Sequence, residues 1–289
     1  MENTEFVAGR PVDVGIGRIT VQRILCPNAG VMTGPGTNSY LVGHDRLALI
    51  DPGPALEAHI DAILQIIGER TLEWILVTHT HQDHSPAATA LQSITGARVA
   101  GMPAAPEAMH QDDSFTPDVI CGDGDRVEGD GFVLSVIHTP GHVSNHVCFL
   151  LEEDRLLFTG DHILQGATPV ILPPDGDMGA YLESLNRLRE LPLRGLAPGH
   201  GAVMREPGEV IDALIAHRQR REQKILAAME REGPALLDTL LMTVYDDVAP
   251  HLLPWARQTL RAHLLKLQNE GRAACGEAWD TGLWSLANG

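Results

Sequence analysis

The sequence predicts a layered α/β domain followed by a small domain of the winged helix-turn-helix class. Up to Gly201, short apolar runs alternate with turns and amphipathic stretches, a mixture that is typical of a layered α/β domain. After Gly201 the chain consists of amphipathic helices and a short strand-like tail. The 14 histidines are a third observation, because several stand beside aspartates just after predicted strands. That clustering indicates a metal site in the first domain.

The expected strands of the first domain are short, apolar and bounded by turn residues. They are Ile19–Leu25, Asn38–Val42, Leu47–Ile50, Trp74–Val77, Arg98–Ala100, Phe132–Ile137, Val147–Leu151, Leu156–Phe158 and Gly195–Ala197. Stretches with the apolar spacing of helices lie between them, at Ala55–Ile67, Pro86–Ile94 and Tyr181–Glu190. This alternation predicts helices packed on the faces of sheets.

The C-terminal part is expected to begin with a long helix from Pro207 to about Glu232, which Gly233-Pro234 ends. Two more helices and a hairpin-like tail follow, at Ala235–Val244, Trp255–Asn269 and Arg272–Leu286. Three helices and a hairpin, in this order, are typical of a winged helix-turn-helix. We therefore expect a first domain over 1–205, a linking helix over 206–232 and a winged helix domain over 233–289.

Composition narrows the class of protein. The net charge of −17 argues against indiscriminate binding to nucleic acid or to an anionic membrane surface. No apolar run reaches the roughly 18 residues of a transmembrane helix. Met1–Arg10 lacks the long apolar run of a signal peptide, and the four cysteines form no CxxC pair. We therefore expect a cytoplasmic protein that does not engage a membrane.

The segment Thr78–His84 directly follows a predicted strand and concentrates metal ligands. It contains His79, His81, Asp83 and His84. His79 and His81 are two residues apart, so an extended segment can point both rings the same way, whereas the adjacent Asp83 and His84 must diverge. A single ion can hardly collect all four side chains, but two neighbouring ions can. The segment therefore predicts a dinuclear site.

Further ligand candidates follow other predicted strands. His142, Asp161 and His200 each stand next to a glycine shortly after a strand, and Asp51 directly follows Leu47–Ile50. Loops at this edge of an α/β sheet converge, so we expect these side chains to meet the first segment. The other histidines outside these segments are expected to have no part in the site: His44, His59, His110, His217, His251 and His263.

These residues resemble the HxHxDH motif and the later ligands of the metallo-β-lactamase superfamily. The resemblance covers residues 18–201 and implies an αββα sandwich with a metal site at one sheet edge. It implies one zinc on His79, His81 and His142. It implies a second zinc on Asp83, His84 and His200, with Asp161 bridging and with Asp83 and Asp161 as the catalytic residues. Asp51 is similar to the family's aspartate that steadies the metal loop.

Within that superfamily, the chain resembles the lactamase-β-like endoribonuclease branch, which acts on single-stranded RNA. The similarity rests on Asn28-Ala29-Gly30, on the run Thr37–Val42, on the helix around Ala216–Ile225 and on the C-terminal winged helix. His162 departs from the animal members, which have a cysteine at this position next to Asp161. We expect its ring to point away from the metals, and His146 to pack behind the ligands rather than to bind.

The ligand set predicts hydrolysis of an ester-like bond. Two cations that share a hydroxide supply a nucleophile at neutral pH, because metal binding lowers the pKa of water to about 7. Ligation by histidine and aspartate alone suits two zinc ions per chain, although manganese and iron are not excluded. Phosphodiesters, thioesters and lactones are all candidate substrates for such a site.

Single-stranded RNA is the preferred substrate on the resemblance, with Arg257, Arg261 and Lys266 as candidate phosphate contacts. The net charge of −17 and an aromatic content of only 4% argue against it. The main alternative is a glyoxalase II-like hydrolase of hydroxyacylglutathione, a small-molecule thioester. Lactonase or β-lactamase activity and a DNA-binding regulator are less favoured. The winged helix would otherwise wall the cleft or form the face of a homodimer.

Overall fold

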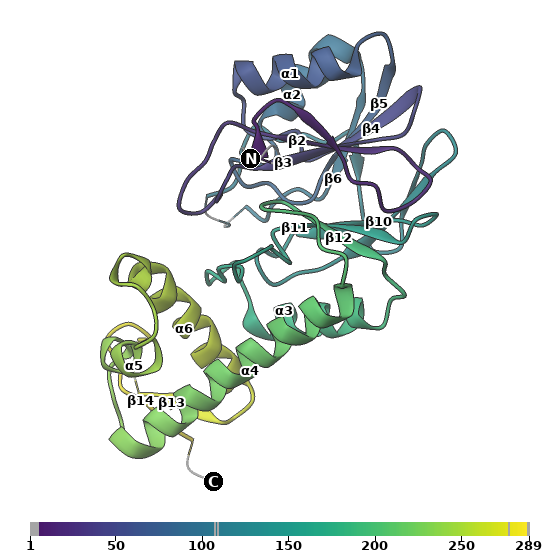
Figure 1. The fold of residues 1–289 in the computed structure, drawn as a ribbon. Coiled ribbons are helices and arrows are strands. Elements are labelled where there is room, and N and C mark those ends of the chain that lie inside the picture. Colours follow the sequence, from purple (N-terminus) through teal and green to yellow (C-terminus); the bar gives the residue numbers. More distant parts are fainter. Residues whose placement is uncertain (1–5, 107, 109, 277, 288–289) are drawn as a thin grey trace.

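Two β-sheets pack face to face between two layers of helices in the computed structural model, which describes residues 6–106, 108, 110–276 and 278–287 (Figure 1). The first sheet contains, in spatial order, β1 (Pro11–Asp13), β2 (Val21–Leu25), β3 (Asn38–Val42), β4 (Arg46–Ile50), β5 (Thr71–Val77), β6 (Arg98–Gly101) and β7 (Val119–Ile120). The second contains β12 (Gly195–Pro198), β11 (Leu156–Gly160), β10 (Val147–Leu151), β9 (Val133–His138) and β8 (Arg126–Glu128).

Parallel strand pairs set the position of the loops that matter for function. In the first sheet, β4 and β5 run parallel, so the residues that follow them lie at the same edge. In the second sheet, β11 and β12 are parallel in the same way. The other pairs are antiparallel apart from β5–β6 and β6–β7. The loops after these four strands therefore converge on one end of the sandwich.

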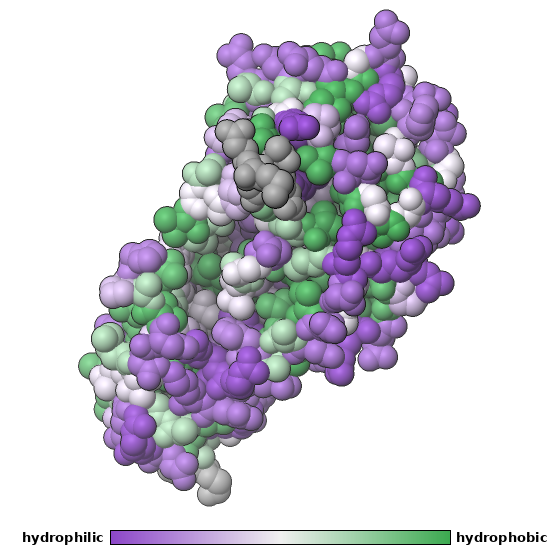
Figure 2. All heavy atoms as spheres, viewed as in Figure 1, coloured by the Kyte–Doolittle hydropathy of each residue, from purple (hydrophilic) through white to green (hydrophobic). Residues whose placement is uncertain are grey.

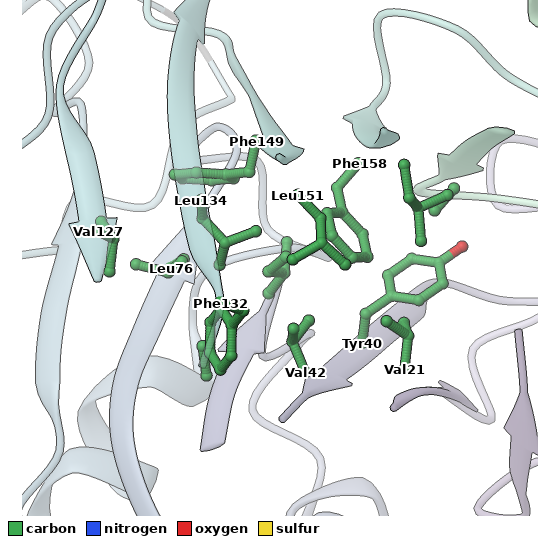
Figure 3. Close-up of a cluster of buried hydrophobic side chains, with 14 of the residues drawn as sticks. Val21, Tyr40, Val42, Leu76, Val127, Phe132, Leu134, Phe149, Leu151 and Phe158 are labelled. Carbon is green, nitrogen blue, oxygen red and sulfur yellow. The ribbon is translucent and has the colours of Figure 1, made fainter. Parts of the chain in front are cut away.

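The core between the sheets is built from inward-facing side chains of both (Figure 3). Tyr40 of β3 lies against Phe158 of β11, with ring centroids 5.2 Å apart. Leu76 of β5 and Phe149 of β10 are fully buried in the same cluster. Burial of each such side chain contributes about 1.5–3 kcal/mol, so this cluster holds the two sheets in a fixed relation.

A layer of helices covers the outer face of each sheet (Figure 1). Helices α1 (Glu57–Ile67) and α2 (Ala87–Thr95) pack on the first sheet through side chains such as Ile63 and Leu91. Helix α3 (Met178–Arg189) and the first half of α4 (Pro207–Glu232) pack on the second sheet. The resulting order of layers is the αββα sandwich that the family resemblance implies.

A smaller C-terminal body is built around the second half of α4 (Figure 1). It contains α5 (Leu237–Val244), a 3-10 turn at Pro250–Leu252, α6 (Leu253–Asn269) and a hairpin. The hairpin strands are β13 (Ala273–Cys275) and β14 (Trp284–Leu286). These elements enclose their own core around the fully buried Trp284, which confirms the winged helix architecture. No helix in the described part of the chain is long and apolar enough to cross a membrane.

The sequence-based predictions agree with the structure for the buried strands and miss the short ones. The strands Asn38–Val42 and Val147–Leu151 are confirmed residue for residue. The short strands β1, β7 and β8 were not predicted, because two or three partly exposed residues carry too little apolar pattern. Helix α3 begins at Met178 rather than at Tyr181, because the Asp177 side chain accepts a hydrogen bond from the Ala180 amide and caps the helix.

Two expectations about the organisation of the chain stay untested. The division of the chain at residues 205 and 232 stays a prediction, although the bounds of α4 lie close to the expected linking helix. The expectation about Met1–Arg10 rests partly on residues 1–5, which lie outside the described residues.

Candidate metal centre

Loops at the ends of four strands carry the predicted ligands to one place. Thr78–His84 follows β5, Asp161 directly follows β11, and His200 follows β12. His142 lies in the turn between β9 and β10. The ligand atoms fall into two compact groups, within each of which all atoms lie within 4.8 Å of one another. The first ligand group is His79, His81, His142 and Asp161, and the second ligand group is Asp83, His84 and His200.

The first ligand group brings three imidazole nitrogens together. His81 Nδ1 lies 3.0 Å from His79 Nε2 and 3.1 Å from His142 Nε2. Asp161 Oδ2 is 3.7 Å from His142 Nε2. The three rings stand nearly perpendicular to one another, with angles of 78–86° between their planes. Nitrogens converging from different directions in this way suit a tetrahedral ion such as zinc.

The second ligand group shares Asp161 with the first. Asp161 Oδ1 lies 3.4 Å from His84 Nε2 and 3.3 Å from His200 Nε2. Asp83 Oδ2 completes the group at 3.4 Å from His84 Nε2 and 3.2 Å from His200 Nε2. One oxygen of Asp161 therefore faces each group, which is the arrangement of a bridging carboxylate.

A hydrogen bond on the far side of several ligands holds each one in orientation. His142 Nδ1 lies 2.7 Å from the Val170 carbonyl oxygen, and His200 Nδ1 lies 3.1 Å from that of Gly36. Asp83 is held differently, because its Oδ2, which itself faces the second ligand group, accepts a hydrogen bond from the Thr37 hydroxyl. Such outer contacts fix which ring nitrogen is free to bind a metal.

Asp51 lies behind the second ligand group. Its Oδ1 accepts a hydrogen bond from the Thr78 amide at 2.8 Å, and its Oδ2 accepts one from the Thr78 hydroxyl. The same Oδ2 lies 2.9 Å from His84 Nδ1. Asp51 thus ties the start of the ligand loop to the orientation of a ligand ring.

Burial and neighbouring charges set the protonation of the ligands. Burial lowers the pKa of His81 to about 3 and that of His79 well below its usual range, so both rings are neutral. Burial also opposes ionisation of Asp83, but the charge of His84 outweighs it and lowers the pKa of this carboxyl group. Neutral imidazoles and ionised carboxylates are the states that bind metals.

His84 and His200 differ from the other ligand histidines. Although burial lowers the pKa of His200, the negative charge of Asp161 and the close approach of Asp161 and Asp83 to its Nε2 raise it to about 10. The same carboxylates raise the pKa of the buried His84. Excess negative charge in this group therefore attracts positive charge, which a divalent cation supplies in place of protons.

Unsatisfied buried atoms also fit a bound cation. His84 Nε2 and Asp161 Oδ1 face each other, yet neither has a hydrogen-bond partner among the described residues. A buried polar atom without a partner is costly, and a metal ion between these atoms would satisfy both. Gly199 makes room for this contact, because a Cβ there would stand 2.7 Å from both Asp161 Oδ1 and His84 Cε1.

Two cavities open beside the ligand groups. The large cavity, about 400 Å³, lies between His142 and Asp161 on one side and the C-terminal body on the other. Its far wall is mostly apolar and includes Val248, Leu252 and Trp255. The small cavity, about 280 Å³, is lined by residues that include Phe6, Leu164, Gln165 and His200. Val31 and Met32 border both cavities and are exposed.

The candidate phosphate contacts are engaged within the protein. Arg257 forms an ion pair with Asp238, and Arg261 lies over the Trp279 ring at 3.5 Å from its centroid. Lys266 forms ion pairs with Glu222 and Glu270. None of these three side chains lines the large or the small cavity.

The histidines near the ligands are buried behind them. The His146 ring stacks on His79, with centroids 5.1 Å apart, and its Nδ1 lies 2.8 Å from the Thr139 hydroxyl. His162 is fully buried between His146 and Tyr181. Neither belongs to the two ligand groups.

Sequence reasoning missed the wall of the large cavity. His217, which was expected to have no role, lines it together with Arg218 and Arg221 of α4 and Tyr245. A signal was present, because charged residues at 218 and 221 fall on the apolar face of α4, and both are buried.

Comparisons with known proteins agree with this architecture. The residues 32–200 match the metallo-beta-lactamase superfamily, and 237–284 match the beta-lactamase associated winged helix domain. The lactamase-like protein aptB of Emericella nidulans is 33% identical over 281 residues, covering 89% of this chain and 86% of that protein. The atrochrysone carboxyl ACP thioesterase of Aspergillus chevalieri is 34% identical over 274 residues, covering 90% of this chain and 85% of that protein.

A solved structure shares the whole fold. A beta-lactamase domain protein from Burkholderia ambifaria superposes with a TM-score of 0.83 at 20% identity, covering 99% of this chain and 96% of that one. The sequence match, the fold and the geometry of the two ligand groups all indicate the same family. The chain belongs to the metallo-beta-lactamase superfamily, and it is a hydrolase with a cluster of histidines and aspartates that suggests a dimetal centre.

Proposed function

We propose that this protein hydrolyses thioesters, with the acyl group bound in the large cavity and two zinc ions held by the two ligand groups. The carrying observation is the apolar wall of that cavity, directly beside His142 and Asp161. A mostly apolar pocket with a few polar groups at one end is the usual form of a site for a small organic group. The similarity to a protein named as an acyl carrier protein thioesterase supports the same substrate class.

The two cavities suit a substrate with two arms. Val31 and Met32 border both, and each cavity reaches one ligand group: the large one reaches His142, and the small one reaches His200. In this proposal the acyl arm occupies the large cavity and the thiol arm leaves past the small one. The scissile bond then lies between them, over Asp161.

The residues of the chain position this reaction. When bound, the two cations would polarise the thioester carbonyl group and lower the pKa of water. Asp161 would hold both ions through its two oxygens, and His142 is kept in orientation by the Val170 carbonyl. Water adds to the carbonyl carbon and the C–S bond breaks, giving a carboxylic acid and a thiol. Because a thiol has a pKa near 8.5, it can leave as the thiolate without a proton donor.

The direct test is turnover by zinc-loaded protein. We expect release of thiol from octanoyl-N-acetylcysteamine, and a loss of at least about a hundredfold in rate for Asp161→Asn, which keeps the shape but removes the bridging charge. Bound zinc should be measured in both proteins. S-lactoylglutathione, a lactone and a β-lactam complete the panel. If the octanoyl thioester is stable while one of these is cleaved, the proposal is wrong.

Cleavage of single-stranded RNA is the second candidate. It is supported by the family resemblance of the sequence and by Arg218, a cation that lines the large cavity together with His142 and Asp161. The pairing of Arg257, Arg261 and Lys266 weakens it. A fluorescent single-stranded RNA in the same panel decides: cleavage that Asp161→Asn abolishes would favour this function over the thioesterase.

A further inference from the structure

Arg218 of α4 is a buried cation without a counter-ion. Its side chain is only 3% exposed, and none of the described residues forms an ion pair with it. It donates a hydrogen bond to the Pro169 carbonyl oxygen, and it stands 5.3 Å from the centroid of the Tyr181 ring and close to the Tyr181 hydroxyl. Its Nε has no partner among the described residues. A buried charge of this kind is costly unless an anion completes the site.

The neighbouring Arg221 shows the contrast. It is also buried, but both of its terminal nitrogens bond the Asp247 carboxylate, at 2.8 and 3.2 Å. Asp247 is therefore occupied, and it does not line the large cavity. Arg218 and Arg221 do line it, and because Arg221 is paired with Asp247, Arg218 supplies the uncompensated positive charge at this end of the cavity.

Other polar groups at this end also lack partners. The Tyr245 hydroxyl and His217 Nδ1 have none among the described residues, and both residues line the large cavity. Tyr245 is 6% exposed. A hydroxyl group and a ring nitrogen beside a guanidinium are the groups that recognise a carboxylate. The opposite wall, with Leu252 and Trp255, stays apolar.

We propose that Arg218 binds a carboxylate at the far end of the acyl group, so that the substrate is the half-thioester of a dicarboxylic acid. This inference rests on the proposed thioesterase function and narrows its substrate class. The thioester end would lie at the ligand groups, the methylene chain along the apolar wall, and the free carboxylate on Arg218. The guanidinium fork matches a carboxylate with two hydrogen bonds.

Binding of a carboxylate by Arg218 has to be distinguished from a role in which Arg218 only positions other residues of the site. Arg218 bonds the Pro169 carbonyl, and the next carbonyl along, that of Val170, orients His142. If Arg218 acted only through this loop, its loss would lower metal content or kcat for every substrate. Binding of a carboxylate instead predicts a change in KM that is confined to substrates with a distal carboxylate.

The experiment compares glutaryl- and hexanoyl-N-acetylcysteamine with zinc-loaded full-length protein. We expect wild type to prefer the glutaryl thioester in kcat/KM and Arg218→Met to lose about tenfold or more on it, mainly through KM, with hexanoyl turnover and zinc content unchanged. Arg220→Met is the matched control, because Arg220 is exposed on the same helix. This substitution should change neither the turnover of the glutaryl thioester nor that of the hexanoyl thioester. Equal losses on both thioesters, or loss of zinc, would overturn the proposal.

Binding measurements keep this test separate from the proposed function. If no thioester is cleaved, thioesterase activity fails, but calorimetry with glutarate and butanoate still decides the role of Arg218. Tighter binding of glutarate that Arg218→Met abolishes supports the site, and equal binding by wild type and variant removes it. Where Arg218→Met does not fold, Arg218→Lys should weaken the binding of glutarate several-fold, because lysine lacks the planar guanidinium fork. Unchanged affinity for glutarate would overturn the proposal. Inorganic phosphate that binds more tightly than glutarate would also overturn it.

Discussion

Asp51 shows how one residue can orient the side chain of a candidate metal ligand. It holds a left-handed backbone conformation, with φ of 51°, directly after β4. This conformation costs a residue with a side chain about 1–2 kcal/mol. In return, the carboxylate reaches both the Thr78 amide and His84 Nδ1. The strain is therefore confined to a residue that orients the metal loop.

We expect Asp51→Asn to weaken metal binding without unfolding the protein. Asparagine tolerates the left-handed conformation, so the backbone is kept, but the charge that pairs with His84 is lost. Loss of such an outer partner typically costs about 10–100-fold in metal affinity. Titration with a zinc chelator would measure the zinc affinity of the variant. Asp45→Asn, at an exposed position, is the control. Unchanged zinc affinity would show that Asp51 has no part in ligand orientation.

At the scale of elements, helix α1 is joined to the first sheet by a buried histidine. His59 of α1 is fully buried, and its Nε2 lies 2.9 Å from the Ser39 hydroxyl of β3. Burial lowers the pKa of His59 to about 4. The folded protein therefore holds this ring neutral under conditions in which the unfolded chain protonates it.

The consequence is a loss of stability in mild acid. Because the folded-state pKa lies below the unfolded value of about 6.5, the contribution is complete above that pH and falls as pH drops toward 4. Linkage gives a loss of about 2 kcal/mol between roughly pH 7.5 and pH 5 from this one group. Urea unfolding at both pH values should show a smaller fall for His59→Gln than for wild type. An identical fall in the two proteins would contradict the assignment.

At the scale of the whole molecule, the large cavity exists only because two bodies meet. Ligand residues contribute one wall, α4 contributes the cationic end, and Leu252 and Trp255 of the C-terminal body contribute the apolar wall. Helix α4 joins the bodies rigidly, since Ile211 packs in the core of one and Ile225 in the core of the other. Hydrophobic residues are visible on the face in Figure 2 where the two bodies meet. The winged helix domain therefore completes the substrate site in the proposed function.

Trp255→Ala tests this assignment. Trp255 is 38% exposed and lines the large cavity, so its removal should lower kcat/KM for a long acyl thioester by about tenfold through lost apolar contact. Hydrolysis of an acetyl thioester, which does not reach the wall, should stay unchanged. Met242→Ala is the control, because Met242 is an exposed apolar residue of the same domain away from the cavity. Equal loss on long and short chains would contradict the assignment.

The ligand set could be predicted from the sequence because its information is local. Each candidate ligand stands shortly after a buried strand, and the apolar runs that identify strands are visible in the chain itself, as at Trp74–Val77 before His79. Since strands of one sheet share an edge, the order of runs and ligands already implies convergence. The short strands β1 and β8 could not be predicted. Each has only three residues, which is too few to show an apolar pattern, and each forms through its register with a neighbouring strand.

The sequence by itself determined the layered fold and the winged helix, and it predicted the seven side chains that the structure brings together in two groups. Only the tertiary structure decided which cations are free: Arg257, Arg261 and Lys266 are paired or stacked, whereas the buried Arg218 has no described counter-ion. Pairing and burial depend on residues far apart in the chain, such as Lys266 with Glu222, and no local pattern encodes them. The large cavity likewise cannot be predicted from a local pattern, because its walls come from two bodies that lie far apart in the sequence.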